Sequence, residues 1–318
     1  MTNRSINRRI PARESRDGAG VRLLRSLGRS AQLRIDPFLM LDNFFSDNPD
    51  DYIAGFPAHP HRGFETVTYM LDGRMRHRDH LGNEAVLESG GVQWMTAGRG
   101  VIHEEMPEQE EGLMRGFQLW INLPAAEKMT PACYQEFAAE QIPLIRDPAS
   151  GALLKLIAGN VEVDGVSHEG VVKGISRSPL MLDLRLPPGS DFSMPLADER
   201  AGFVYLFEGE GTLAGAPLHL NEAAELGRGE RLSLSAGEQG ASLLLLAARP
   251  IGEPVAQYGP FVMNTLEEVN QAIEDYQQGR LVSKIPRKPS PIRGCRKSLS
   301  ATLGSRCSAM SRAGTLRY

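Results

Sequence analysis

Apolar residues fall in short runs along the chain, and turn residues close each run. Thr66–Leu71 (TVTYML), Val92–Thr96 (VQWMT) and Gly116–Leu123 (GFQLWINL) are rich in the β-branched and aromatic residues that favour strands. Asp72-Gly73 follows the first run and is a dipeptide typical of a hairpin turn. The even spacing of such runs predicts an all-β protein built as a sandwich or barrel.

A short internal repeat suggests that the barrel occurs twice. Val67–Gly73 (VTYMLDG) matches Phe203–Gly209 (FVYLFEG), and Met95–Gly98 (MTAG) matches Leu234–Gly237 (LSAG). The two matches occur in the same order along the chain, with nearly equal offsets, as a tandem duplication requires. We therefore predict two related β-domains.

The length of 318 residues suits this division, because domains usually contain roughly 100–200 residues. We predict a first domain over 1–140 and a second over 141–281, with 138–146 as the linker. A capping-box sequence at Thr265–Glu268 and Gly279 predict a single short helix at the end of the body.

Charge is divided unevenly between the body and the C-terminal tail. Residues 282–318 contain nine Lys and Arg and no acidic residue, whereas residues 1–281 carry a net charge of −13. The tail is rich in Ser, Arg, Gly and Pro without a sustained period, which predicts a disordered extension. It lacks the interleaved aromatic residues of a single-strand binder, so we expect no direct nucleic-acid binding.

The N-terminus is also rich in arginine, with eight between Arg4 and Arg29. Because Val21–Leu27 (VRLLRSL) has the pattern of a strand, we interpret this region as the first edge of the domain and not as a targeting peptide.

The cysteines and the apolar runs bear on location. The three cysteines, Cys133, Cys295 and Cys307, are widely spaced without a CxxC motif, which argues against a disulfide framework or a thiolate zinc site. The longest apolar run, Ala241–Ala248, is far shorter than a membrane span of about 20 residues. We expect a cytoplasmic protein without membrane association.

Two pairs of polar residues with i, i+2 spacing are the candidate chemistry. His59 and His61 form one pair, and His103 and Glu105 form the other. Alternate residues of a strand face the same side, so each pair can point at one metal ion. Three imidazoles and a carboxylate suit Fe(II), Mn, Co, Ni, Cu or Zn, and the ligand types alone do not choose among these metals.

The repeat predicts that the second domain has no such site. The first offset places Pro195 and Ala197 opposite His59 and His61, and the second places Ser242 and Leu244 opposite His103 and Glu105. None of the four is a metal ligand of the expected type.

Other histidines and the large side chains near the ligands have simpler interpretations. His77 and His80 compete as ligands, but their spacing puts them on opposite faces of a strand, so we expect surface residues or supports of the ligands. Arg62 and Arg99 flank the ligands and are expected to contact them. The barrel core is expected to contain both tryptophans, Trp94 and Trp120.

Several separated motifs resemble the pirin family, whose members are two-barrel proteins of the cupin superfamily. The motifs are HPHRGFETVTYMLDG, QWMTAGRGVIHEEM, FQLWINL and GPFVMN, and the resemblance covers about residues 15–281. It implies a bicupin whose N-terminal barrel holds one Fe(II) through His59, His61, His103 and Glu105. The family pattern is His-x-Glu, so Glu105 and not Glu104 is the implied ligand.

The resemblance implies two alternative functions. The first is a dioxygenase of the quercetin 2,3-dioxygenase type, which opens a flavonol ring with O2 and releases CO, with Glu105 as ligand and general base. The second is an iron-dependent, redox-responsive regulator that binds a transcription factor or a metabolic enzyme. We expect a small aromatic substrate and O2 under the first function, a protein partner under the second, and a monomer under both.

Overall fold

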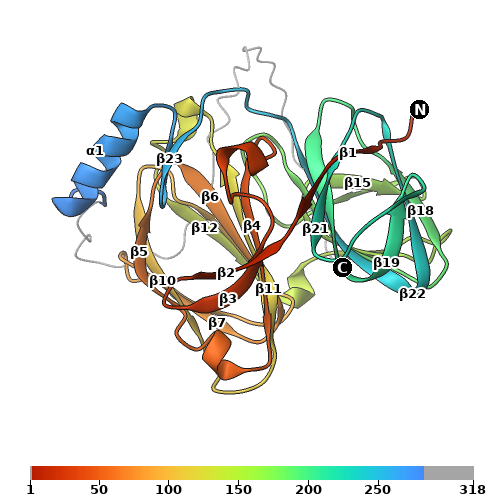
Figure 1. The fold of residues 1–318 in the computed structure, drawn as a ribbon, viewed down its shortest axis with the longest axis horizontal. Coiled ribbons are helices and arrows are strands. Elements are labelled where there is room, and N and C mark those ends of the chain that lie inside the picture. The colour runs from red at the N-terminus through yellow and green to blue at the C-terminus, as the bar shows by residue number, and fades with distance from the viewer. Residues whose placement is uncertain (1, 283–318) are drawn as a thin grey trace, which may run out of the picture.

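The computed structural model describes residues 2–282, and the predicted disordered tail lies outside the described residues apart from residue 282. Strands dominate, and two barrels lie side by side (Figure 1). The prediction of an all-β architecture with one C-terminal helix is confirmed. No helix within residues 2–282 has the length and apolarity needed to cross a membrane.

The first barrel consists of a seven-stranded and a four-stranded sheet. The larger sheet has the order β12 (Cys133–Phe137), β9 (Val92–Thr96), β6 (Phe64–Asp72), β11 (Met114–Asn122), β4 (Phe38–Ser46), β3 (Val21–Arg25), β2 (Arg13–Asp17). The smaller sheet has the order β5 (Phe56–His61), β10 (Val101–Pro107), β7 (Met75–Asp79), β8 (Glu84–Leu87). All pairings in these two sheets are antiparallel.

The second barrel is built on one nine-stranded sheet. Its main path is β1 (Ile6–Pro11), β21 (Glu222–Leu226), β19 (Ala201–Leu213), β22 (Arg231–Ala248), β17 (Leu180–Leu186), β14 (Leu153–Ala158), β13 (Leu144–Arg146). Two further strands, β18 (Asp191–Pro195) and β20 (Ala216–Pro217), pair with β22 and β19. Two small hairpins complete the strands, β15 (Asn160–Val163) with β16 (Val166–Glu169) and β23 (Ala256–Tyr258) with β24 (Phe261–Met263).

Short helices cover the remaining turns. Helix α1 (Leu266–Gln277) is capped at its N-terminus by Thr265, whose side chain accepts from the Glu268 backbone N–H, as the capping box predicts. Gly279 follows the helix with a φ of 66°, the left-handed conformation that glycine adopts without strain. The 3₁₀ helices are η1 (Ala31–Leu33), η2 (Pro49–Asp51), η3 (Ala125–Glu127) and η4 (Ala139–Gln141).

The two barrels share one strand order at their centres, which tests the predicted repeat. β6 lies between β9 and β11, and β19 lies between β21 and β22. VTYMLDG and FVYLFEG lie on β6 and β19, so the first match joins equivalent strands.

The second match is wrong. MTAG closes β9, whereas LSAG lies in the half of β22 that pairs with β18. Ser242 and Leu244 lie in the other half of β22, which pairs with β17, and so they are not the counterparts of His103 and Glu105. A four-residue match cannot fix a register when turn lengths differ between the copies.

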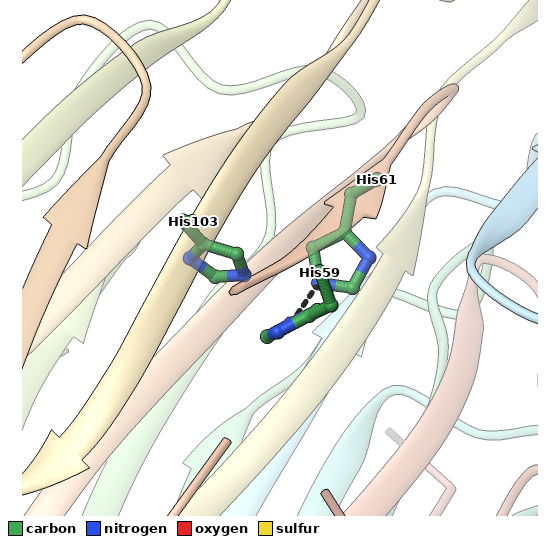
Figure 2. Close-up of side chains that lie close together, drawn as sticks. All are labelled: His59, His61 and His103. Carbon is green, nitrogen blue, oxygen red and sulfur yellow. Dashed lines mark hydrogen bonds between the residues drawn. The ribbon is translucent and has the colours of Figure 1, made fainter. Parts of the chain in front are cut away.

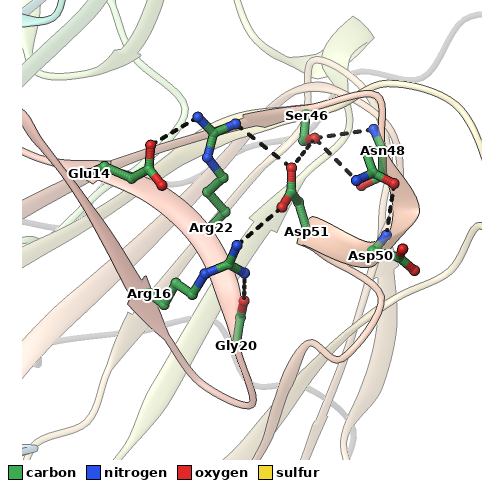
Figure 3. Close-up of polar contacts among 8 residues, drawn as sticks. All are labelled: Glu14, Arg16, Gly20, Arg22, Ser46, Asn48, Asp50 and Asp51. Atoms are coloured by element: carbon green, nitrogen blue, oxygen red, sulfur yellow. Dashed lines mark hydrogen bonds and ion pairs between the residues drawn. The ribbon is translucent and has the colours of Figure 1, made fainter.

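The arginine-rich N-terminus belongs to the sheets. Figure 3 shows Arg16 and Arg22, on β2 and β3, holding Asp51 of η2, with Arg22 also bonded to Glu14 at 2.9 Å. Arg4 is buried and donates to four backbone carbonyls of the second barrel. The arginine-rich segment thus forms β2 and β3 at one edge of the seven-stranded sheet, which confirms the interpretation of the region as a domain edge.

The terminal segments are exchanged between the barrels. β1 crosses to the second barrel and pairs with β21, whereas β23, β24 and α1 return to the side of the first barrel (Figure 1). A single hydrophobic cluster joins the barrels, with Phe38 and Val67 from the first and Phe203 and Leu244 from the second. Within this interface the Tyr69 hydroxyl donates to the Asp183 carboxylate at 2.7 Å.

Candidate metal centre

Two neighbouring strands of the small sheet position the histidine cluster. β5 and β10 are antiparallel, with His59 opposite His103 and His61 opposite Val101. Figure 2 shows the three imidazoles from these strands turned toward one another. One ring nitrogen from each of His59, His61 and His103 lies within 4.8 Å of the other two, the only such group of metal-binding side chains within residues 2–282.

Hydrogen bonds orient two of the rings. The Nδ1 of His59 lies 2.8 Å from the carbonyl of Pro57, which can only accept, so Nδ1 carries the proton of the neutral ring and Nε2 carries a lone pair. The Nε2 atoms of His59 and His61 are 3.0 Å apart. The Nδ1 of His103 lies 3.0 Å from Nε2 of His77, and the buried Nε2 of His103 has no hydrogen-bond partner.

This arrangement fits a transition-metal ion. A buried polar atom without a partner is costly, and a metal ion would supply the missing partner of His103 Nε2. The donor set contains imidazole nitrogens without a thiolate, which suits several divalent transition metals. The prediction that His59, His61 and His103 come together is therefore met by the structure.

Burial also determines the protonation state of the rings. It lowers the pKa of His61 and of His103 well below the usual histidine value, and neighbouring imidazoles lower both further. Both rings are therefore neutral at pH 7. Neutral imidazole is the form that binds a metal ion.

Glu105 is buried in the same region but lies outside the group of three nitrogens. Its carboxylate accepts from Thr68 Oγ1 at 2.7 Å and from Gln118 Nε2 at 3.1 Å. Glu104 faces the other side of β10, where it pairs with Arg78 at 3.4 Å. Strand alternation therefore separated the two glutamates correctly, and the role of Glu105 as a ligand stays a prediction.

A cavity of about 610 Å³ opens onto the cluster. His59, His61 and Glu105 lie in its wall, beside Gln118 and Trp120. Its apolar surface is supplied by Leu23, Leu39, Met40, Phe44, Phe56 and Pro57, and polar groups at other points include Arg25, Asp42 and Gln257. The site therefore combines a metal-ligand cluster with space for an organic molecule.

The turn after His61 is held by the C-terminal segment. Arg62 is buried and donates to Asp275 at 2.8 Å and to the carbonyl of Arg99. Gly63 has a φ of 90°, and an added Cβ would lie 1.9 Å from the Val262 carbonyl oxygen, so only glycine fits. Lys128 donates to the carbonyls of Gly63 and Val262 at 2.8 and 2.9 Å, and burial lowers its pKa to about 8.

Several neighbouring predictions have mixed outcomes. His77 is buried against His103, whereas His80 lies outside the cluster and accepts from the Ile102 N–H. The guanidinium of Arg62 contacts the C-terminal segment and not a ligand ring, so its predicted role was wrong. Trp94 lies in the core as predicted, but Trp120 also lines the cavity, with its ring 5.3 Å from that of His61.

Sequence reasoning missed the groups that hold Glu105 and those that close the cavity. Thr68 and Gln118 lie on β6 and β11, within the two runs interpreted only as buried strands. A polar residue in such a run was the available signal, because buried polar groups need partners. The cavity is also lined by residues from the far end of the chain, Gln257, Gly259 and Pro260. No local sequence pattern predicts that contact.

Two tandem barrels with a histidine cluster inside the first define a protein of the two-domain cupin class. The chain belongs to the pirin family: residues 20–121 match the pirin family model, and residues 181–282 match the pirin C-terminal cupin domain.

Relatives and solved structures agree with this membership. A protein of Pseudomonas aeruginosa, provisionally named a quercetin 2,3-dioxygenase, is 52% identical over 83% of this chain and 93% of its own length. A pirin-like protein of Caulobacter vibrioides is 47% identical over 88% of this chain and its full length. The crystal structure of quercetin 2,3-dioxygenase from Acinetobacter baumannii superimposes with a TM-score of 0.80, at 33% identity, over 89% of this chain and all of its own.

Proposed function

We propose that the protein is a metal-dependent dioxygenase that opens the ring of a flavonol with O2 and releases CO. The observation that carries the proposal is a cluster of three imidazoles, two of which, His59 and His61, line a cavity of about 610 Å³. A volume of this size is typical of small-molecule sites, which range over about 300–1,000 Å³. The names of two similar proteins, from Pseudomonas aeruginosa and Acinetobacter baumannii, support the same activity.

His59, His61, His103 and Glu105 would hold the metal ion, which we propose to be one Fe(II) per chain, as the family resemblance implies. A bound divalent metal supplies a Lewis acid that can orient a hydroxylated substrate and O2. Three histidines and one carboxylate leave positions open on a six-coordinate ion. The ligands alone also fit other divalent transition metals.

Glu105 would act on the substrate hydroxyl as a general base. As that O–H bond breaks, the proton passes to a carboxylate oxygen of Glu105 and the electron pair stays on the substrate oxygen. Thr68 and Gln118 donate to the carboxylate and fix the direction in which it accepts the proton. Trp120 and Phe56 supply apolar wall against which aromatic rings can pack.

The decisive experiment measures the aerobic loss of quercetin absorbance together with CO release by the Fe(II)-loaded protein. Glu105→Ala should abolish turnover. Glu104→Ala is the matched control, because Glu104 is adjacent in sequence but faces Arg78 on the other side of β10, and it should retain turnover.

Equal loss of activity in both variants would contradict the assigned role of Glu105. A protein with full iron content and no turnover would contradict the dioxygenase itself and would favour the redox-responsive regulator, whose test is iron-dependent binding of a protein partner.

The cytoplasmic location and the monomeric state are further proposals from the sequence. Size-exclusion chromatography with light scattering tests the second, and a mass near 34.8 kDa is the expected result.

A further inference from the structure

His77 lies inside the first barrel, next to the histidine cluster. It occupies the middle of β7 and faces Glu105 on β10 in the antiparallel register. Its inward neighbours on the strand are Met75 and Asp79, whereas Arg76 and Arg78 face outward toward Glu84. Only 4% of His77 is exposed, so this imidazole cannot exchange its protein partners freely for water.

The contact between His77 and His103 is specific. Nε2 of His77 lies 3.0 Å from Nδ1 of His103. The two ring centroids are 5.1 Å apart. The ring of Tyr134, on β12, packs against His77 with a centroid distance of 5.1 Å. His77 is thus held between two rings with one nitrogen directed at His103.

The direction of this hydrogen bond decides which nitrogen of His103 carries its proton. If His103 Nδ1–H donates to His77, then His103 Nε2 keeps a lone pair for a metal ion. If His77 Nε2–H donates instead, neutral His103 must carry its proton on Nε2. That atom is buried without an acceptor, and a proton there would block the metal.

We infer that His77 is a positioning residue that accepts the Nδ1–H of His103 and thereby directs Nε2 of His103 at the metal ion. In the same way, the Pro57 carbonyl, which can only accept, takes the Nδ1–H of His59. His77 is the side-chain counterpart of that carbonyl. The inference rests on the proposed metal site but not on flavonol turnover, because orienting a ligand matters for any metal chemistry at this position.

Three variants test the inference with Co(II) as the probe. His77→Leu removes the acceptor and should raise the Co(II) dissociation constant by about 10–100-fold, the range typical for partners of metal-bound histidines. His77→Gln places a carbonyl oxygen near the lost nitrogen and should restore most of the affinity. His80→Leu changes the nearby histidine outside the cluster and should bind Co(II) like the parent.

A second readout needs neither metal nor turnover. Nitrogen-15 NMR of the metal-free parent should show His103 as one tautomer, protonated on Nδ1, and His77→Leu should show a mixture. A third readout is the visible spectrum of bound Co(II), which should shift in His77→Leu and recover in His77→Gln, a recovery that a loss of packing alone would not produce. If His77→Leu does not fold, the parent spectrum and His77→Gln decide the question.

The outcomes separate the two proposals. Normal Co(II) affinity in a folded His77→Leu, or an Nε2-protonated His103 in the parent, would overturn the inference alone. A parent protein that takes up no Co(II) would overturn the proposed metal site and the inference with it. Absence of quercetin turnover with normal Co(II) binding and the expected tautomer would leave His77 in its role and remove only the dioxygenase.

Discussion

The two barrels use the same strand pair in opposite ways. In the first, β5 and β10 face each other with His59 opposite His103. In the second, β18 and β22 form the equivalent pair, with Phe192 opposite Leu234 and Met194 opposite Leu232, and all four side chains lie in one hydrophobic cluster. The shared fold therefore does not specify a site, because the side chains of one strand pair decide whether the interior holds a histidine cluster beside a cavity or a packed apolar core.

The comparison also shows what each interior requires. The apolar pair needs only volume and burial, which is why its members are interchangeable in kind. The histidine pair needs supports around it, and the structure provides them through His77, Thr68 and Gln118. Four predictions break or sharpen this contrast, in order of decreasing effect.

The largest effect is expected for His61→Ala in the first barrel. The variant loses a ligand from a buried cluster, so metal content after desalting should fall by more than about tenfold, a loss at least as large as that for an outer partner. Elemental analysis gives the metal content. His219→Ala in the second barrel is the control, because His219 is exposed there. A fully loaded His61→Ala protein would show that the ligand assignment is wrong.

Leu234→Ala in the second barrel should lower the stability of the protein and leave its metal content unchanged. Leu234 is 2% exposed, and truncation of such a core residue costs about 2–5 kcal/mol of unfolding free energy. Denaturant unfolding monitored by fluorescence measures this loss, while metal content should equal that of the parent. A clear drop in metal content with little change in stability would mean that the barrels are not functionally separate.

A smaller effect is expected where the C-terminal helix supports the histidine turn. The hydrogen bond from Arg62 lowers the pKa of Asp275, so the folded state favours the ionised carboxylate. This contribution is present above the unfolded pKa of about 3.9 and is lost as pH falls through the lower folded value.

Asp275→Asn should therefore destabilise the protein by about 1 kcal/mol at pH 7 and by progressively less below pH 4. Unfolding curves at several pH values measure the difference, with Glu274→Gln on the exposed side of the helix as control. A pH-independent difference would rule out the ionised pair as its source.

No effect is expected from deletion of residues 283–318. The site and its supports lie within residues 2–282, so metal content and quercetin turnover of the shortened chain should match the parent. A loss of either quantity would assign the basic tail a part in the activity.

The sequence was informative where the relevant contacts are local. His59 with His61, and Glu105 rather than Glu104, follow from the two-residue period of a strand, and the structure turns these side chains inward. The all-β class likewise follows from short runs and turn residues.

Contacts between distant segments could not be predicted in this way. The hydrogen bonds that Thr68 and Gln118 make with Glu105 depend on how β6 and β11 lie across the barrel from β10. The wrong alignment of LSAG has the same origin, because a short match carries no information about pairing register. The return of Pro260 to the cavity is also invisible to any local period.

The exchange of terminal segments makes each half of the molecule incomplete without the other. If the chain were divided before β13, the C-terminal piece would contain β21 without its partner β1. The exposed edge of β21 would then favour aggregation. The N-terminal piece would lack the Val262 carbonyl and Asp275, which hold the turn after His61. If the folded chain were cut between η4 and β13, the two pieces should remain associated and copurify. Either piece produced alone should be insoluble.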